Sequence, residues 1–598
     1  MAENYPADPA NPNLPPQQPD PSAAPAPAPK RRRKRWPWVI VGILLFLILL
    51  VALAPTLIST GPGKSFIVGK VNSSLNGKLD VADLSIGWLS GVTLNGVKID
   101  DQQGRRVLEI ASVRVPISLI GAARGKYDLG ETVIDKPNLV NLEIYEDGST
   151  NLGKLMKDSG GNATPPAAPP DQTSPQPTQP TKIPDVKGKI TINQARATVS
   201  GPAVRSPIHL ESGDVVVNIP NINSEIANDA KFVYRVGQSP PGTITIVGAI
   251  DAIENNLVNV DKLAADEKIQ ITSADLAGIE PFLQSPGAKT TLAGIASGAL
   301  QLKSAGFQSC GLDGQLAVTN FAYGGDALKG DIYKSSNVAL PISIATSSAG
   351  ADTLIKIQTL KLETDHALVD LSGEATRGAL TNLAKREKPG AKGQLALAVN
   401  TKDMPGLFNL LRNTLGLQKD VKITSGEFKT RVEVALTPEN AVVKQSLYAV
   451  AAGQNGTQPV KLEPVYLDTA VSIPDIGDLA VHLKSGFATI NGSGASLASL
   501  NIKGDADLGR LRSQIGQFTD LGKLDLSGTA DFEVISKGDL RKPESESDLS
   551  AILNLRNVIV RGLEGKPEIN QPRVALVTTA TLVSGREGGE TVDHVKTA

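Results

Sequence analysis

The sequence predicts a mainly β protein: an N-terminal transmembrane helix, then an elongated antiparallel β-sheet interrupted by a few short amphipathic helices. Three observations predict this architecture. Apolar and polar residues alternate over most of the chain after Lys64, which is the period of a strand with one dry face and one wet face. Aromatic residues make up only 4% of the chain, while β-branched and small residues are plentiful. One long aliphatic run lies near the N-terminus.

The composition excludes several classes of protein. The chain has 598 residues, too many for one compact core, so we expect several domains or a repeat array. Its formal net charge of −1 gives no electrostatic reason to expect a nucleic acid or a strongly acidic partner. Cys310 is the only cysteine, which excludes an intrachain disulfide and a multi-cysteine metal site, and we expect it to be a buried small residue.

The N-terminal region has the pattern of a signal anchor. Residues 1–29 contain ten prolines and predict a disordered tail, and a basic run follows. No charge occurs from Trp36 to Gly63, a stretch long enough to cross a hydrocarbon core of about 30 Å. We predict a cytoplasmic tail over 1–35 and a transmembrane anchor over 36–60. The residues assigned to the anchor are Trp36, Trp38, Val39, Leu44, Phe46, Leu50 and Leu57, and those assigned to membrane topology are Arg31, Arg32, Arg33, Lys34 and Arg35.

The charges decide the orientation of this anchor. Cations on the N-terminal side of a span remain in the cytoplasm, so the chain after Lys64 is expected to be exported. A cleaved signal peptide is the alternative, because Ala52-Leu53-Ala54 fits a cleavage site, although Pro55 directly after the cut disfavours it. The basic run also fits a nucleic-acid-binding segment, but its position beside the span favours a role in topology.

A proline-rich segment divides the exported part. Residues 160–181 contain seven prolines, so we predict a linker over 158–182 between a β domain at 64–157 and a repetitive β domain at 183–598. In the clearest strand, Phe428, Val432 and Val434 share one face and charged residues the other. Continuous apolar runs are scarce, which favours antiparallel pairing.

Three similar helix starts interrupt these strands. Asp275, Asp403 and Asp507 each precede apolar residues at helical spacing, so each is a predicted N-cap. A glycine follows each Asp, at distances of 23, 23 and 21 residues. These glycines are Gly298, Gly426 and Gly528. We predict a divergent module of one capped helix plus strands, occurring around 275–303, 403–436 and 507–536, in an elongated stack.

Residues suited to catalysis or metal binding do not converge. The four histidines, His209, His366, His482 and His594, are far apart in the sequence. The segment at 61–65, GPGKS, lacks the first glycine of a phosphate loop. The segment at 491–496, NGSGAS, lacks the strand–elbow–helix pattern of a hydrolase nucleophile. Asp100-Asp101 and Asp147-Gly148 have the pattern of turns. We therefore expect no enzyme, no cofactor and no bound nucleotide or metal.

The segment from Trp38 to Met156 resembles the N-terminal domain of the AsmA-like family of Gram-negative envelope proteins, which includes TamB. The matching pieces are Asn76-Gly77, "GVKIDDQQG", "VRVPISLIGAARG" and the hairpin "IDKPNLVNLEIYEDGSTN". The resemblance covers about 100 residues well and is weaker over 183–598. The proline-rich tail and the insert at 160–181 depart from the family's pattern.

The resemblance implies a curved, taco-like sheet anchored in the inner membrane and projecting into the periplasm, similar to chorein-type lipid bridges. It implies binding of phospholipid acyl chains in an apolar groove and a role in lipid transport and outer-membrane biogenesis. The alternative is a non-enzymatic assembly or scaffold protein with a closed core, whose partners are other envelope proteins. Alternation alone fits both. The residues expected on the groove face are Val92, Leu94, Val97, Ile99, Phe428, Val432, Val434, Phe532 and Val534.

The start of the groove is expected at Gly91–Gly104. Val92 and Leu94 are even-numbered, whereas Val97 and Ile99 are odd-numbered, so in a regular strand the two pairs would point to opposite faces. Asn95-Gly96 is therefore predicted to form a bulge or turn that returns the apolar side chains to one face. Lipid would leave the bilayer at this point.

Overall fold

The computed structural model describes residues 59–155, 182–259, 262–283, 290–306, 309–350, 352–474, 477–496, 499–522, 524–538, 546–562, 568–587 and 590–597. These residues belong to one compact unit, Pro55–Ala598. The predicted tail, and the predicted anchor apart from Ser59 and Thr60, lie outside the described residues. Within the described part of the chain, no helix is both long and apolar enough to span a membrane.

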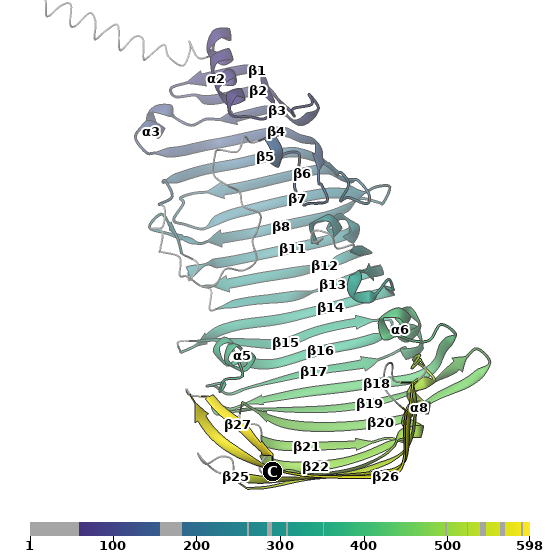
Figure 1. The fold of residues 1–598 in the computed structure, drawn as a ribbon. Coiled ribbons are helices and arrows are strands. Elements are labelled where there is room, and N and C mark those ends of the chain that lie inside the picture. Colours follow the sequence, from purple (N-terminus) through teal and green to yellow (C-terminus); the bar gives the residue numbers. More distant parts are fainter. Residues whose placement is uncertain are drawn as a thin grey trace, which may run out of the picture. The chain divides into compact units, whose positions relative to one another are not determined.

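Twenty-five strands form a single sheet, in which neighbours along the chain are almost always neighbours in space (Figure 1). The prediction of a mainly β, antiparallel protein with few helices is confirmed. The strands are β1 (Lys78–Gly87), β2 (Gly91–Asp100), β3 (Arg106–Val115), β4 (Tyr127–Glu143), β5 (Val186–Ser200), β6 (Ile208–Ile219), β7 (Ile226–Val236), β8 (Gly242–Asp251), β11 (Ala264–Asp275), β12 (Thr291–Ala305), β13 (Cys310–Gly324), β14 (Ile332–Ala349), β15 (Asp352–Thr364), β16 (Ala367–Thr376), β17 (Gly393–Thr401), β18 (Val421–Leu436), β19 (Ala441–Asn455), β20 (Gln458–Ile473), β21 (Gly477–Lys484), β22 (Ala488–Ser496), β23 (Asn501–Asp507), β24 (Asp525–Gly538), β25 (Glu546–Arg561), β26 (Ile569–Glu587) and β27 (Glu590–Thr597). A separate small hairpin consists of β9 (Ile253–Glu254) and β10 (Leu257–Val258).

One pair of strands departs from the antiparallel prediction. β4 and β5 are parallel, with Ile134 opposite Ile192. A parallel pair needs a long connection, because the chain must return to the start of the first strand before the second begins. The segment between them contains the predicted linker, 158–182. The sheet nevertheless continues from β4 to β5, so the predicted 64–157 and 183–598 regions share one sheet.

Side chains cap the helices that connect some of the strands. Asp275 accepts a hydrogen bond from the N–H of Ala277 at the start of η3 (Leu276–Gly278), which is followed by α4 (Glu280–Leu283). Asp403 caps α6 (Met404–Leu410), which α7 (Arg412–Leu415) follows. Asp507 caps α8 (Leu508–Gly516). The three predicted N-caps are therefore confirmed, although the first helix is short and begins as a 3-10 turn.

These three capped helices recur at a fixed strand interval. They follow β11, β17 and β23, and each interval is six strands. Successive strands of an antiparallel sheet run in opposite directions, so strands that are six apart run in the same direction. The three connections therefore lie at the same end of the strands. Figure 1 shows α6 and α8 at this end, with α3 (Leu119–Ala123) and α5 (Arg377–Ala384) at the opposite end. The glycines that follow the three helices, Gly298, Gly426 and Gly528, all have positive φ.

Two of the sequence motifs near the N-terminus pack against each other. Asn151 closes the hairpin after β4, because its side-chain oxygen accepts from the N–H of Glu143 at 2.9 Å and its amide donates to the Asn141 carbonyl at 2.9 Å. Leu155, just beyond, is buried, and its Cδ2 lies 2.8 Å from where a Cβ on Gly77 would lie. Only glycine therefore leaves room for the hairpin against the start of β1.

An ionic network fixes the same hairpin. Arg105 donates to Glu143 at 2.7 Å and to Asp101 at 2.8 Å. The hydrogen bond from Arg105 is the main reason that the pKa of Glu143 lies below its ordinary value of 4.5. Burial alone raises the pKa of Asp101, but hydrogen bonds from Arg105 and Gln103 outweigh burial and leave it below 3.8. Both carboxylates therefore stabilise the fold when ionised.

We predict that this network makes the hairpin sensitive to acid. Carboxyl groups whose pKa is lowered by folding contribute their full stabilisation above the unfolded value, here 4.5 for Glu143, and lose it as pH falls through the folded value. Hydrogen exchange of peptides covering 141–152, corrected for intrinsic rates, is expected to be constant from pH 7 to about 5 and to accelerate below about 4. An Arg105→Ala variant should exchange faster at pH 7 and lose most of this pH dependence. Equal pH dependence in both proteins would contradict the assignment.

We also predict that Gly426 cannot be replaced without loss of stability. An added Cβ would lie 2.5 Å from the Met404 sulfur and 2.7 Å from the Val450 carbonyl oxygen, at a φ of +159°. Gly426→Ala is expected to cost about 1–3 kcal/mol, seen as a lower urea midpoint. Gly69→Ala is the control, because no atom outside its own helix lies within 4 Å of the added Cβ. Equal midpoints for the two variants would show that the close approach is not a constraint.

Candidate functional site

A row of directly opposed residues crosses the sheet from β1 to β26. In almost every strand it carries an aliphatic side chain or glycine, and Gln445, Thr469 and Thr578 are its three polar members. The row consists of Leu84, Leu94, Val113, Ile134, Ile192, Val215, Ala230, Ile246, Ile269, Leu300, Gly314, Ile342, Leu360, Leu371, Leu397, Val432, Gln445, Thr469, Val481, Gly492, Ile502, Val534, Ala551 and Thr578. We call it the apolar row. At a strand spacing of about 4.8 Å, its path across the sheet is on the order of 110 Å.

Several large side chains on this face are only half-buried, although their strands lie within the sheet. Leu397 belongs to the row and is 38% exposed. Leu302, Leu362 and Leu576 lie two residues from row positions, hence on the same face, and are 37%, 41% and 55% exposed. Leucines on the inner face of a closed sandwich interdigitate with a second sheet and become buried. Within the described residues, the apolar face therefore lacks a second layer over these positions.

Helices cover the two ends of the strands on this face. At one end, Met404, Val421 and Ile423 are buried between α6 and β18. At the other end, Ala375, Ala379, Leu436 and Ala441 form a buried cluster where α5 packs on the sheet. Burial is therefore greatest near the strand ends, and the strand centres between these helices are more exposed.

Contacts between neighbouring connections reinforce the end that carries α6 and α8. The N–H of Gln418, after α7, donates to the Phe518 carbonyl after α8 at 2.7 Å. Thr414 in α7 donates its backbone N–H to Asp331, before β14, at 2.7 Å. Arg205, between β5 and β6, forms a 2.9 Å ion pair with the buried Glu280 of α4. These bonds join loops that are far apart in the sequence along one side of the apolar face.

An apolar hollow lies where the face meets these helices. It has a volume of about 420 Å³, within the range of roughly 300–1,000 Å³ of small-molecule sites. Its few polar atoms include the hydroxyl of Tyr333, which donates to Thr364 at 2.7 Å. Its lining residues are Leu316, Val318, Phe321, Tyr323, Leu328, Tyr333, Val338, Leu340, Leu362, Thr364 and Leu411.

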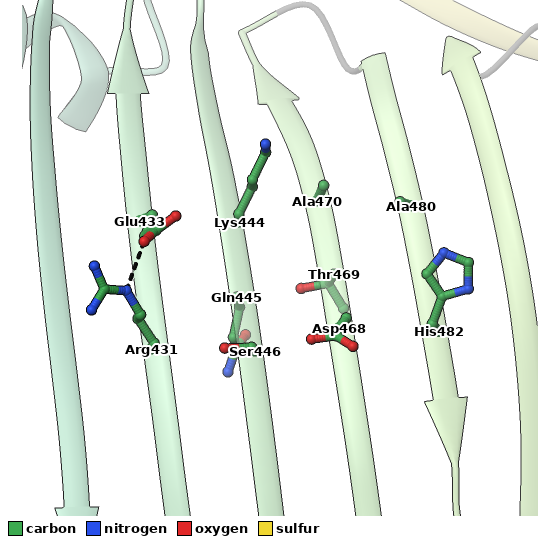
Figure 2. A pocket seen from close by; sticks show the side chains of 10 residues that line it. All are labelled: Arg431, Glu433, Lys444, Gln445, Ser446, Asp468, Thr469, Ala470, Ala480 and His482. Atoms are coloured by element: carbon green, nitrogen blue, oxygen red, sulfur yellow. Dashed lines mark hydrogen bonds and ion pairs between the residues drawn. The ribbon is translucent and has the colours of Figure 1, made fainter.

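The opposite face of the sheet is polar. Figure 2 shows Arg431, Ser446, Asp468 and His482 side by side on four successive strands, β18 to β21, at the floor of a hollow of about 340 Å³. Arg431 is paired with Glu433 at 2.6 Å. The hollow is lined by two cations, Arg431 and Lys444, and two carboxylates, so its charges balance. It therefore has no net preference for an anion or a cation.

The structure places seven of the nine predicted groove residues on the apolar face, whereas Val97 and Ile99 lie beyond Gly96 and have the opposite parity to the row member Leu94. Leu94, Val432 and Val534 belong to the apolar row itself. Phe428 and Val434 lie in register with Val432, and Phe532 with Val534. Val92 lies opposite Ile86, Val97 opposite Val81 and Ile99 opposite Leu79.

The irregularity predicted at Asn95-Gly96 has a different form from a bulge. Gly96 has a φ of +61°, but β2 keeps its register with β1 on both sides of it. Val97 and Leu84, which lie on either side of this point, are both buried. β2 therefore contains no inserted residue at this point. Its apolar residues are even-numbered before Gly96, which has a left-handed backbone conformation, and odd-numbered after it.

A polar pair interrupts the apolar face beside the row. Glu267 is buried, and its Oε1 accepts a hydrogen bond from the Asn228 amide at 2.5 Å. The other carboxylate oxygen is buried without a hydrogen-bond partner. A Cβ on Gly248, directly opposite Glu267, would lie 2.5 Å from this oxygen. Sequence reasoning missed this pair, although Glu267 has the parity of its apolar neighbours Ile269 and Ile271.

The structure also places the residues considered for chemistry. His366 contacts Asp403 at 3.2 Å and the Lys334 carbonyl at 3.1 Å, and His482 contacts Asn491 at 3.2 Å. His209 lies 3.4 Å from Thr198, and the side chain of His594 lies outside the described part. Among the described residues, no group of three or more His, Cys, Asp or Glu residues is placed to hold a metal ion.

One helix on this face was not predicted. Thr376 caps α5 by accepting from the N–H of Ala379 at 3.2 Å, and Leu380 and Leu383 pack against the buried cluster. A threonine before apolar residues at helical spacing was the available signal.

No protein-family model, no curated protein and no solved structure matches this chain.

We predict that Asn228→Ala destabilises the sheet, because it removes the hydrogen bond to a buried carboxylate. The expected cost is about 1–3 kcal/mol, measured as a lower urea midpoint. The double variant Asn228→Ala/Glu267→Met is the control, since replacing both partners by apolar groups removes the unpaired charge. It should recover most of the loss. An unchanged midpoint for Asn228→Ala alone would contradict this account.

Proposed function

We propose that this chain is a membrane-anchored envelope protein of the AsmA-like type that binds phospholipid acyl chains along the apolar row. It is held by the predicted anchor at 36–60, with the sheet on the periplasmic side of the inner membrane. The observation that carries the proposal is the extension of the largely apolar row over 24 strands together with half-exposed leucines on the same face. A largely apolar and partly exposed surface of this extent marks a binding surface.

The side chains along the row favour lipid tails over other ligands. They are mostly Leu, Ile, Val, Ala and Gly, which offer dispersion contacts and few hydrogen bonds. An acyl chain needs no polar partner, and each methylene removed from water is worth about 0.8 kcal/mol. The charged opposite face would remain in water. The proposed transport requires no chemical step, because the protein lowers the free-energy cost of moving a lipid tail between membranes.

An open groove is the form in which such a sheet would hold lipid. The helices at both strand ends leave the centres of the strands accessible, and the hollow beside Leu316 and Leu411 supplies a wider place along the same face. The alternative, a scaffold with a closed core, requires the leucines of the apolar face to be covered. Their exposure favours the open form.

Site-specific photo-crosslinking distinguishes these two functions. A crosslinking amino acid at Val432, Phe428 or Phe532 in cells is expected to capture phospholipid. The same amino acid at Arg431 or Glu433 is the matched control, because these neighbours of Val432 lie on the opposite, polar face. Lipid adducts from the Val432 position and none from Arg431 would support the conduit. Crosslinks to protein alone, or no crosslinks, from all three apolar positions would rule it out.

A further inference from the structure

The first described residues fasten the N-terminal edge of the sheet. α2 (Gly61–Ser73) runs beside β1, and its side chains satisfy backbone groups on the free edge of that strand. Lys64 donates to the Ala82 carbonyl at 2.9 Å, and Asn72 accepts from the N–H of Leu79 at 2.6 Å. The hydroxyl of Ser59 accepts from the N–H of Ile86 at 2.8 Å. The chain therefore enters this unit at a fixed place, beside the end of β1.

Apolar side chains are exposed around this entry point. Leu89, in the turn between β1 and β2, is 76% exposed. The Trp88 carbonyl in the same turn accepts from the N–H of Leu119, which joins the turn to α3. Ile120 of α3 is 39% exposed, and Phe66 of α2 is 76% exposed. Isolated exposed apolar residues are common, but these lie on three elements that are bonded to one another or to β1.

Basic residues accompany the apolar ones. Arg124 and Lys126 directly follow α3 and are exposed, as is Lys70 on α2. A mixture of large apolar side chains, a tryptophan and cations is the composition of a surface that sits at the level of lipid headgroups. Cations near an anionic lipid surface strengthen binding to it.

We propose that this corner, formed by Leu89, Ile120, Arg124 and Lys126 where the β1–β2 turn meets α3, docks on the surface of a phospholipid bilayer. The predicted aliphatic span ends at Ile58, one residue before Ser59, so chain continuity brings the corner to the membrane that holds the anchor. Leu89 and Ile120 insert at the interface while Arg124 and Lys126 contact headgroup phosphates. Docking sets the orientation of β1 and β2, and with it the start of the apolar row at Leu84 and Leu94. The inference rests on the predicted anchor and does not require the row to bind lipid.

Tryptophan fluorescence tests this directly, because Trp36, Trp38 and Trp88 are the only tryptophans. The full chain carrying Trp36→Phe and Trp38→Phe is reconstituted in vesicles of phosphatidylcholine and phosphatidylglycerol, with or without bromine near the headgroup end of the acyl chains. We expect loss of Trp88 emission in brominated vesicles. The reporter control has all three tryptophans replaced and carries Tyr466→Trp, on the polar face far from the corner along the sheet, where no loss is expected.

Two further variants decide how the corner binds. Leu89→Ser with Ile120→Ser, both exposed and therefore compatible with folding, is expected to reduce the quenching of Trp88. Arg124→Glu with Lys126→Glu should reduce it in anionic vesicles at low salt more than in neutral ones. Unquenched Trp88 in the starting protein, or quenching that the Leu89/Ile120 variant leaves unchanged, would overturn the docking proposal.

A reporter on the apolar row separates this result from the proposed function. Phe532→Trp, in the chain that lacks the other three tryptophans, reports lipid on the row at a point far from the corner along the sheet. Quenching of Trp88 without quenching at this position would support docking and count against lipid binding along the row. Quenching at this position with Trp88 unaffected would overturn docking and leave the row as a lipid site.

Discussion

Backbone hydrogen bonding between consecutive strands is the interaction on which the rest of the molecule depends. In a domain with two packed layers, side chains between the layers supply most of the stabilisation. Here no second layer covers the exposed leucines among the described residues. Each interior strand is therefore held by backbone hydrogen bonds to the strand on either side and by side-chain contacts with these neighbours on the same face. Apolar side chains opposite one another still shield part of each other's surface. The face therefore contributes to stability and remains accessible to a ligand.

This dependence on nearest neighbours explains where the buried side chains lie. The structure reaches full burial where a helix folds onto the strand ends, as at Met404 and Ala379, and around the N-terminal hairpin at Leu155. Those sites also hold the most specific polar contacts, including the three aspartate caps and the Arg205–Glu280 pair. The helices thus stabilise the margins of the face and leave its centre uncovered. A sheet built this way combines buried contacts at the strand ends with partly exposed leucines between them.

Much of this architecture was predictable because its determinants are local. Alternation placed Val432 and Val534 on one face, and an aspartate before apolar residues at helical spacing identified the starts of η3, α6 and α8. The parallel pairing of β4 with β5 was not predictable, since it depends on the path of a long connection and not on the pattern of either strand. The Glu267–Asn228 pair was missed because its members come from different strands, and only the register brings them together. The partial exposure of Leu397 required the structure, as alternation is the same in open and closed sheets.

The even interval of six strands between the capped helices has a consequence for how such a chain can change its length. An antiparallel sheet reverses direction at every strand, so adding or removing one strand would move every later helix to the other end. Adding a hairpin of two strands leaves all the later helices where they are. β4 and β5 run in the same direction, so the alternation of strand directions shifts by one strand at this pair. As a result α3, which precedes the pair, lies at the end opposite α6 and α8. The length of the sheet can therefore change in hairpin units, by insertions that leave the helices on the same side of the apolar face.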